Sequence, residues 1–251
     1  IKGYPVRLPL DVMMTFTANP EDYTARGKIV TPLKDRIGSE IRTHYPQTRS
    51  DAMAITAQEA WIDRADPGAA DASGVTVPAY VREIVEEVAF QARANKKVDL
   101  RSGVSQRLPI TCLENVVSNA ERRALAASEQ PTARVTDIYA ALPSITGKFE
   151  LEYEGELRGA DNVARDLIRS AVAAVFDGRF DGVDTHLVVE WFDMGGSLPG
   201  SDAVSSAELI AQVSEIQGLS ELTRQAGAAP DAAPPTVAAA IDFVLEGLYA
   251  Q

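Results

Sequence analysis

Apolar residues recur at helical spacing through most of the chain after residue 50. In "PAYVREIVEEVAFQARAN", the apolar residues Val81, Ile84, Val85, Val88 and Phe90 fall close to one face of a helix, as in an amphipathic helix that packs on a core. The same spacing, together with capping residues such as Ser105 and Thr136, predicts further helices. Five of these cover residues 50–65, 105–127, 161–176, 206–216 and 237–249, and one more begins at Thr136.

Three segments have the pattern of extended structure. Residues 5–19 contain the β-friendly run Val12–Thr17 and end at an Asn-Pro pair, which predicts a buried strand. "KFELEYE" (148–154) predicts a short strand, and "HLVVEWF" (186–192) predicts an extended segment. Between the first strand and the helices, Thr31-Pro32 has the capping chemistry of a short helix that ends before Gly38.

These patterns divide the chain into three predicted parts and give a mixed, predominantly α fold class. Residues 50–147 form a small helical domain, residues 1–49 precede it as a separate part, and residues 148–251 form an α+β extension. The stretch "GAAPDAAPPT" has the composition of a linker, so a linker is expected near 226–235.

Charge and cysteine content restrict the partners and the compartment. Asp and Glu outnumber Lys and Arg by 36 to 24, a net charge of −12, which disfavours nucleic acid and anionic membranes as partners. One cysteine, Cys112, excludes an internal disulfide and is predicted to be a small core residue. With no apolar run of membrane-spanning length and no signal pattern, we expect a soluble cytoplasmic protein. His44 and His186 lack companions at metal-ligand spacing.

Three polar side chains have chemistry that suits a nucleotide site. Asn19 leaves the predicted strand with a free amide, which can both donate and accept a hydrogen bond and so orient a water beside a phosphate. The guanidinium of Arg36 suits the γ-phosphate of a nucleotide. Arg107, at the start of a helix, is a third candidate cation.

The segments "FTANPEDY", "TPLKDRIG" and "SGVSQR" together resemble AAA+ ATPases of the branch that holds magnesium chelatase ATPase subunits and MoxR-like proteins. The resemblance implies that Asn19 is the sensor-1 residue, Arg36 the arginine finger and Arg107 the sensor-2 residue. It also implies ATP and Mg²⁺ as cofactors, a homo-oligomeric ring, and a possible partner with a von Willebrand A-type domain. The activity implied is ATP hydrolysis that drives metal insertion into a porphyrin or remodelling of a protein.

The chain departs from this family in lacking the phosphate loop G-x-x-x-x-G-K-[ST] and an acidic Walker B strand. It therefore resembles only the C-terminal part of such a protein: the end of the α/β P-loop core, the helical lid and an extension. We expect the chain begins inside a larger protein and hydrolyses little ATP alone.

Other interpretations stay open. Asn19 can simply end a turn, Arg36 can pair with Asp35 or Glu40, and Arg26 or Arg42 can be the finger instead. Arg107 can be a solvated helix-opening residue. The whole chain can be a non-catalytic assembly or binding module derived from the lid and extension. A DNA-remodelling ATPase is disfavoured by the net charge and by the lack of a DNA-binding motif.

Overall fold

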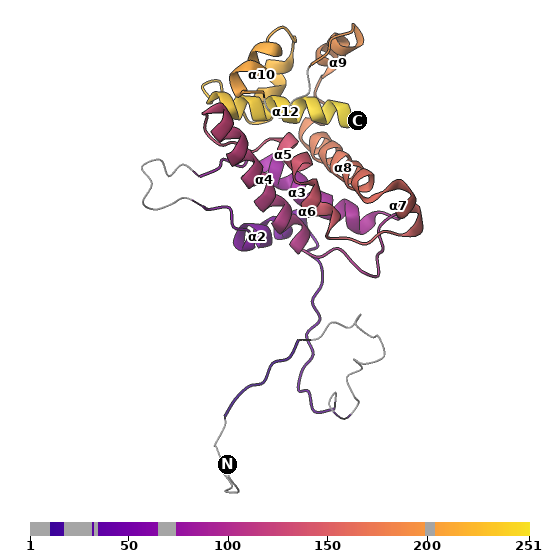
Figure 1. Ribbon diagram of the computed structural model, residues 1–251. Helices are drawn as coiled ribbons and strands as arrows, with labels where there is room; N and C mark the ends of the chain where they lie inside the picture. The colour runs from indigo at the N-terminus through magenta and orange to yellow at the C-terminus, as the bar shows by residue number, and fades with distance from the viewer. Residues whose placement is uncertain (1–10, 18–31, 33–34, 65–73, 199–203) are drawn as a thin grey trace. The chain divides into compact units, whose positions relative to one another are not determined.

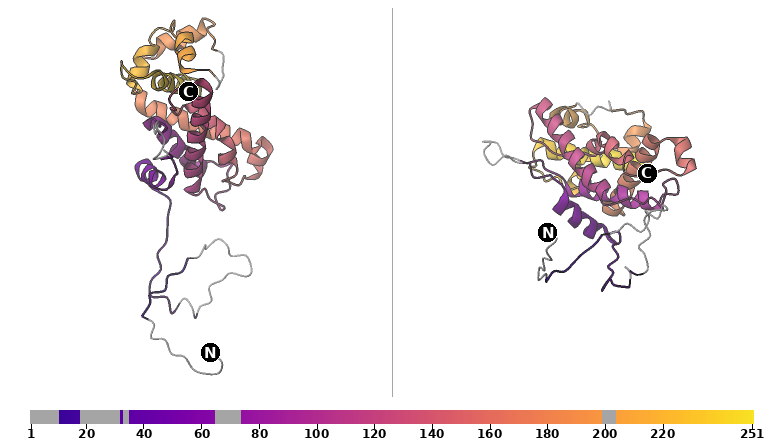
Figure 2. Two further views of the ribbon diagram at one scale, coloured as in Figure 1. Left: turned by 60° about the vertical axis from the view of Figure 1, so that its left-hand side comes forward. Right: turned by 60° about the horizontal axis from the view of Figure 1, so that its bottom comes forward.

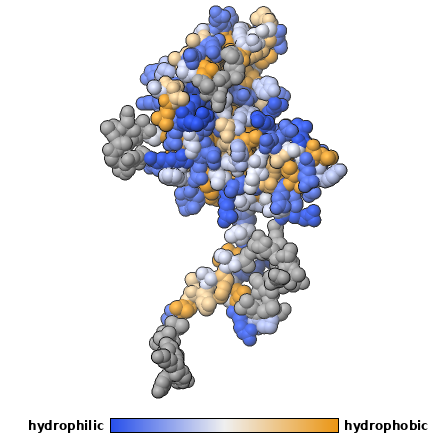
Figure 3. All heavy atoms as spheres, viewed as in Figure 1, coloured by the Kyte–Doolittle hydropathy of each residue, from blue (hydrophilic) through white to orange (hydrophobic). Residues whose placement is uncertain are grey.

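The computed structural model describes residues 11–17, 32, 35–64, 74–198 and 204–251. The chain forms two compact units, residues 1–43, called here the N-terminal unit, and residues 44–251, called the helical unit. In the N-terminal unit, residues 11–17 belong to no helix or strand, and their apolar side chains are exposed (Figure 3). The predicted strand at 5–19 is therefore wrong over its described part, because no strand among the described residues supplies backbone partners to it.

In its described residues, the helical unit folds mainly into α-helices (Figure 1). They are α2 (Arg49–Glu59), α3 (Ala79–Ala94), α4 (Arg107–Ala127), α5 (Val135–Ala140), α6 (Leu142–Thr146), α7 (Tyr153–Arg158), α8 (Ala160–Phe180), α9 (His186–Asp193), α10 (Ser206–Gln212), α11 (Leu219–Gln225) and α12 (Pro234–Ala250). A mainly helical fold is thus confirmed for the described residues.

The centre of the helical unit is the contact of α3 with α8, and of α8 with α12. Tyr80 of α3 stacks on Phe243 of α12 with ring centroids 4.3 Å apart, and Phe176 of α8 meets Phe243 edge to face at 5.9 Å. Gly247 allows this close approach, because a Cβ at that position would overlap the Phe176 ring. The predicted lid and extension therefore share one core, and the boundary expected at 147–148 lies inside one compact unit.

The two extended segments predicted after residue 147 are wrong. In "KFELEYE", Leu151 forms one isolated antiparallel bridge with Val98, and α7 begins two residues later. "HLVVEWF" is helix α9, in which Val188 is buried against the core. Asp184 fixes the start of α9, since its carboxylate accepts the His186 N–H at 2.9 Å. The extension is consequently helical in its described residues and not α+β.

Two other expectations about the C-terminal region also change. The segment near 226–235 is a short packed turn in which Ala226 and Ala228 are buried, and α12 already begins at Pro234, where proline suits a first helical turn. The helix predicted at 206–216 ends at Gln212. The expected linker is therefore a short turn inside the helical unit, packed through Ala226 and Ala228, and not a spacer between two parts.

Candidate functional site

The start of α4 places Arg107 on the surface of the helical unit. Gly103, with φ +73°, turns the chain just before α4, and the Val104 N–H donates to the Tyr45 hydroxyl at 3.1 Å. Ser105 Oγ accepts the Arg107 N–H at 3.3 Å, and Leu108 anchors the first turn in the core. The Arg107 side chain is exposed, and within the described ranges its guanidinium has neither a hydrogen bond nor an ion pair.

This position is electrostatically unfavourable for a cation. The N-terminus of an α-helix carries a partial positive charge, and α4 is 21 residues long. No acidic residue lies in the first turn of α4 to offset the charge of Arg107. The positive charge of Arg107 therefore adds to that of the helix end, and the combination suits an anion.

Gln106, the residue before Arg107, joins three helices. Its amide nitrogen lies within hydrogen-bond distance of three acceptors: Glu86 Oε2 on α3 at 2.9 Å, and Thr56 Oγ1 and the Ala52 carbonyl on α2 at 3.2 and 3.4 Å. Its amide oxygen accepts from Arg93 Nη2 of α3 at 3.2 Å. The residue that opens α4 is thus the polar connection between α2, α3 and α4.

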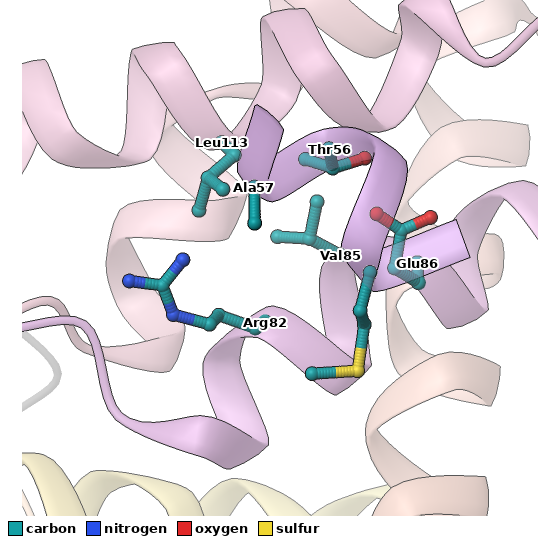
Figure 4. A pocket seen from close by; sticks show the side chains of 7 residues that line it. Thr56, Ala57, Arg82, Val85, Glu86 and Leu113 are labelled. Carbon is teal, nitrogen blue, oxygen red and sulfur yellow. The ribbon is translucent and has the colours of Figure 1, made fainter. Parts of the chain in front are cut away.

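A small pocket lies beside this connection, between α2, α3 and α4 (Figure 4). Its cavity volume is about 10 Å³, room for about one water molecule and far below the several hundred Å³ of most ligand pockets. Its lining combines apolar side chains with one carboxylate and one guanidinium: Met53, Thr56, Ala57, Arg82, Val85, Glu86 and Leu113. The pocket suits water or a small group and is too small for a nucleotide.

Glu86 is the unusual group in this pocket. Glu86 is 1% exposed, and no described residue offers a hydrogen-bond partner to its Oε1 atom. Burial raises the pKa of Glu86, against the opposing effects of hydrogen bonds from Thr56 and Gln106 and of the Arg93 charge. Burial likewise lowers the pKa of Arg82. Both side chains are therefore held where their charged forms are disfavoured.

This gives a prediction for the pH dependence of stability. A carboxyl whose folded pKa is raised contributes stability at low pH, and loses it as pH rises from its unfolded value of about 4.3 through the folded pKa. Replacing Glu86 with Gln removes that loss. We therefore expect Glu86→Gln to gain stability relative to wild type as the pH rises from 4.5 to 8. Urea unfolding at several pH values measures this as an increase in the free energy of unfolding of the variant minus that of wild type.

Glu154→Gln provides the control, since Glu154 is exposed on α7 and its replacement removes the same negative charge. The interpretation of Glu86 would be wrong if the two variants differed from wild type in the same way at every pH.

The other predicted site residues lie in the N-terminal unit. Arg36 is exposed in a turn, and its Nη1 donates to the Pro32 carbonyl at 2.6 Å. Glu40 pairs with Arg42 at 3.1 Å, and the described residues offer no carboxylate partner to Arg36. Asn19 and Arg26 lie outside the described residues. Arg36 belongs to the N-terminal unit, whereas Arg107 belongs to the helical unit.

A buried ion network at the junction of α4 and α5 was not predicted. Asp137 is fully buried and accepts from Arg123 Nη2 at 3.0 Å, Asn119 Nδ2 at 2.6 Å and the Arg134 N–H at 2.7 Å. Arg134 also donates to Ser206 Oγ at 2.7 Å. Because these charges neutralise one another inside the core, the network is structural and offers no site for a ligand.

The prediction that Cys112 is a core residue is confirmed, since it is fully buried and burial raises the pKa of its thiol to about 12. Across the described ranges, no group of three or more His, Cys, Asp or Glu residues could hold a metal ion.

None of the helices in the described part of the chain is both long and apolar enough to cross a lipid bilayer. Comparison of the sequence and structure with protein-family models, with curated proteins and with solved structures finds no match to this chain.

Proposed function

We propose that this chain is the C-terminal part of an AAA+ ATPase similar to magnesium chelatase ATPase subunits and MoxR-like proteins. In this proposal it supplies Asn19, Arg36 and Arg107 to nucleotide sites at the subunit interfaces of a homo-oligomeric ring. Arg107 would contact the phosphates of ATP held by its own subunit, and Arg36 would reach the ATP of a neighbour. Asn19 would orient the attacking water.

The observation that carries the proposal is the exposed, unpaired guanidinium of Arg107 at the start of α4. Ion pairs hold many of the other helical-unit arginines, among them Arg49, Arg64, Arg123, Arg134, Arg158, Arg179 and Arg224. Within the described residues, Arg165 is likewise exposed without an ion pair or a hydrogen bond, but it lies inside α8 and not at a helix end. Arg107 instead stands at a helix end that repels it, in the sequence context "SGVSQR". A polyphosphate brought to this end would satisfy both the guanidinium and the helix terminus.

The residues of this chain fit only part of an ATP site. Arg107 and Arg36 suit phosphate oxygens, but the sequence holds no glycine-rich phosphate loop with its lysine. The described residues likewise hold no carboxylate cluster for Mg²⁺. ATP supplies the phosphoryl chemistry, and in this proposal its binding loop and Mg²⁺ ligands come from protein outside this sequence. The driven process would be metal insertion into a porphyrin or remodelling of a protein, with a von Willebrand A-type domain protein as partner.

The proposal predicts that Arg107 closes the helical unit on nucleotide. The sequence places the moving lid at residues 50–147, and because the lid shares a core with the extension we expect residues 44–251 to move together. In the longer protein that includes the phosphate loop, a non-hydrolysable ATP analogue should change fluorescence transfer between labels at Thr17→Cys and Glu154→Cys. Arg107→Ala should abolish that change, since closure depends on contacts made only in the closed state.

Both labelling positions are exposed, whereas Cys112 is fully buried and should not react. Arg101→Ala is the matched control, because Arg101 is an exposed arginine shortly before α4. Closure that survives in Arg107→Ala as in Arg101→Ala would exclude Arg107 as the nucleotide contact.

The alternative function is a non-catalytic assembly or binding module. The observation in its favour is the apolar surface of α9 and the residue after it, where Leu187 is 49% exposed and Met194 is 76% exposed. Nucleotide binding distinguishes the two functions. A module would show the same assembly with and without ATP, and its assembly would respond to changes on α9 and not to Arg107→Ala.

A further inference from the structure

Helix α2 is attached to the helical unit mainly by polar contacts. It lies at the edge of that unit in each view (Figures 1 and 2). Only Ala52 and Thr56 of α2 are buried, whereas α3 buries nine residues. Ile55 of α2 is 40% exposed. Little apolar surface therefore holds α2 in place, and its contacts with α3 and α4 depend on hydrogen bonds and ion pairs.

These polar contacts are few and can be named. Gln106 bonds to both Ala52 and Thr56, and Arg49 pairs with Glu87 of α3 through Nη2 at 2.5 Å and Nε at 3.0 Å. Just after α2, the Trp61 N–H donates to Glu114 Oε1 of α4 at 3.0 Å. Of these contacts, the one made by Gln106 lies next to Arg107, the proposed phosphate contact.

The contact beneath α2 is also incompletely satisfied. Among the described residues, Oε1 of Glu86 and Nη1 of Arg93 are buried without a hydrogen-bond partner. A cavity of about 10 Å³ lies between Ala57 of α2 and Arg82 of α3 (Figure 4). A close-packed apolar contact would lose much dispersion energy on opening, but this one has little buried apolar surface and two polar atoms with unmade hydrogen bonds. Moving α2 therefore costs less than moving a core helix.

We propose that Gln106 is a positioning residue that couples phosphate binding at Arg107 to the docking of α2 on α3 and α4. This inference rests on the proposed function. Gln106 and Arg107 are adjacent, so a shift of the α4 terminus toward a phosphate displaces the Gln106 amide from Ala52 and Thr56.

The first part of the test needs no nucleotide. In the 251-residue chain, Gln106→Met keeps the side-chain length but removes the amide and with it every polar contact that the amide makes to α2 and α3. We expect hydrogen exchange of the α2 backbone amides to accelerate about tenfold or more, because α2 opens locally once the Gln106 contacts are lost. Exchange rates in α3 and α8 should stay unchanged. Gln212→Met, at the exposed glutamine that ends α10, is the matched control. If Gln106→Met unfolds the chain, Thr56→Val removes one acceptor on α2 and should give a smaller acceleration confined to α2.

The second part tests the coupling in the longer protein. A non-hydrolysable ATP analogue should change α2 exchange in wild type, and the change should disappear in Gln106→Met although the analogue still binds. Unchanged α2 exchange in the first part, or an analogue response in Gln106→Met equal to that of wild type, overturns the role of Gln106 and leaves the proposed function standing. No binding of the analogue to the wild-type protein overturns both.

Discussion

Replacing Arg36 with alanine in the longer ATPase is expected to lower ATP hydrolysis by about a thousandfold or more while ATP binding stays nearly intact. An arginine finger stabilises charge that develops on the transferred phosphoryl group, so its loss affects turnover far more than ground-state binding. Arg36 is available for this role, since it is exposed and its described hydrogen bond goes to the Pro32 carbonyl. Phosphate release by assembled rings and calorimetric ATP binding measure the two effects separately.

Arg42→Ala is the matched control for Arg36→Ala. Both arginines are exposed in the N-terminal unit, but Arg42 pairs with Glu40 at 3.1 Å. Arg36→Lys keeps the charge without the planar fork and should recover only part of the activity. Loss of turnover in Arg42→Ala with normal turnover in Arg36→Ala would make Arg42 the finger. Normal turnover in both variants would exclude Arg36 and Arg42 as the arginine finger and leave Arg26 as the candidate.

The helices with one continuous buried face were predictable from the sequence. In α3, the spacing of Val81, Ile84, Val85 and Val88 predicts a helix, and all four side chains are buried. α8 and α12 follow the same rule, with boundaries that differ from the predicted ones by one to four residues. Their periodic faces meet in the core, so local pattern and packing agree.

The segments that failed are short and rich in β-branched or aromatic residues. "HLVVEWF" has seven residues, too few for periodicity to separate a strand from a helix. Its helical form is supported by Asp184, whose carboxylate accepts the His186 N–H, and by the burial of Val188, which depends on the rest of the fold. "KFELEYE" fails because a strand needs a partner, and Val98 supplies only one bridge.

The candidate site was predictable only where a motif marks it. The sequence predicts that Arg107 is at the start of a helix because "SGVSQR" contains a capping serine, and α4 begins there. The role of Gln106 was not predictable, because its partners Thr56 and Glu86 lie 50 and 20 residues away. The Arg123–Asp137 pair was not predictable either, because the two residues are 14 positions apart and their burial follows only from how α4 packs against α5.

That buried pair gives the prediction with the largest expected effect on stability. Asp137 is 0% exposed and Arg123 is 4% exposed, and their charged atoms lie 3.0 Å apart. Asp137→Ala removes the carboxylate that accepts from Arg123, Asn119 and the Arg134 N–H, and leaves a buried guanidinium with less compensation. We expect a loss of about 3–5 kcal/mol in the free energy of unfolding, the scale of breaking one side of a buried ion pair. Urea unfolding of the 251-residue chain at pH 7 measures it.

Asp166→Ala is the control on the surface. Asp166 pairs with Arg158 at 2.7 Å, a shorter distance than in the buried pair, but both side chains are well exposed. Water and salt screen such a pair, so its loss should cost far less than Asp137→Ala. Asp137→Asn keeps an acceptor without the charge and should fall between the two. A cost for Asp137→Ala no larger than that for Asp166→Ala would mean that Glu129, 3.5 Å from Arg123, is enough to neutralise the buried guanidinium.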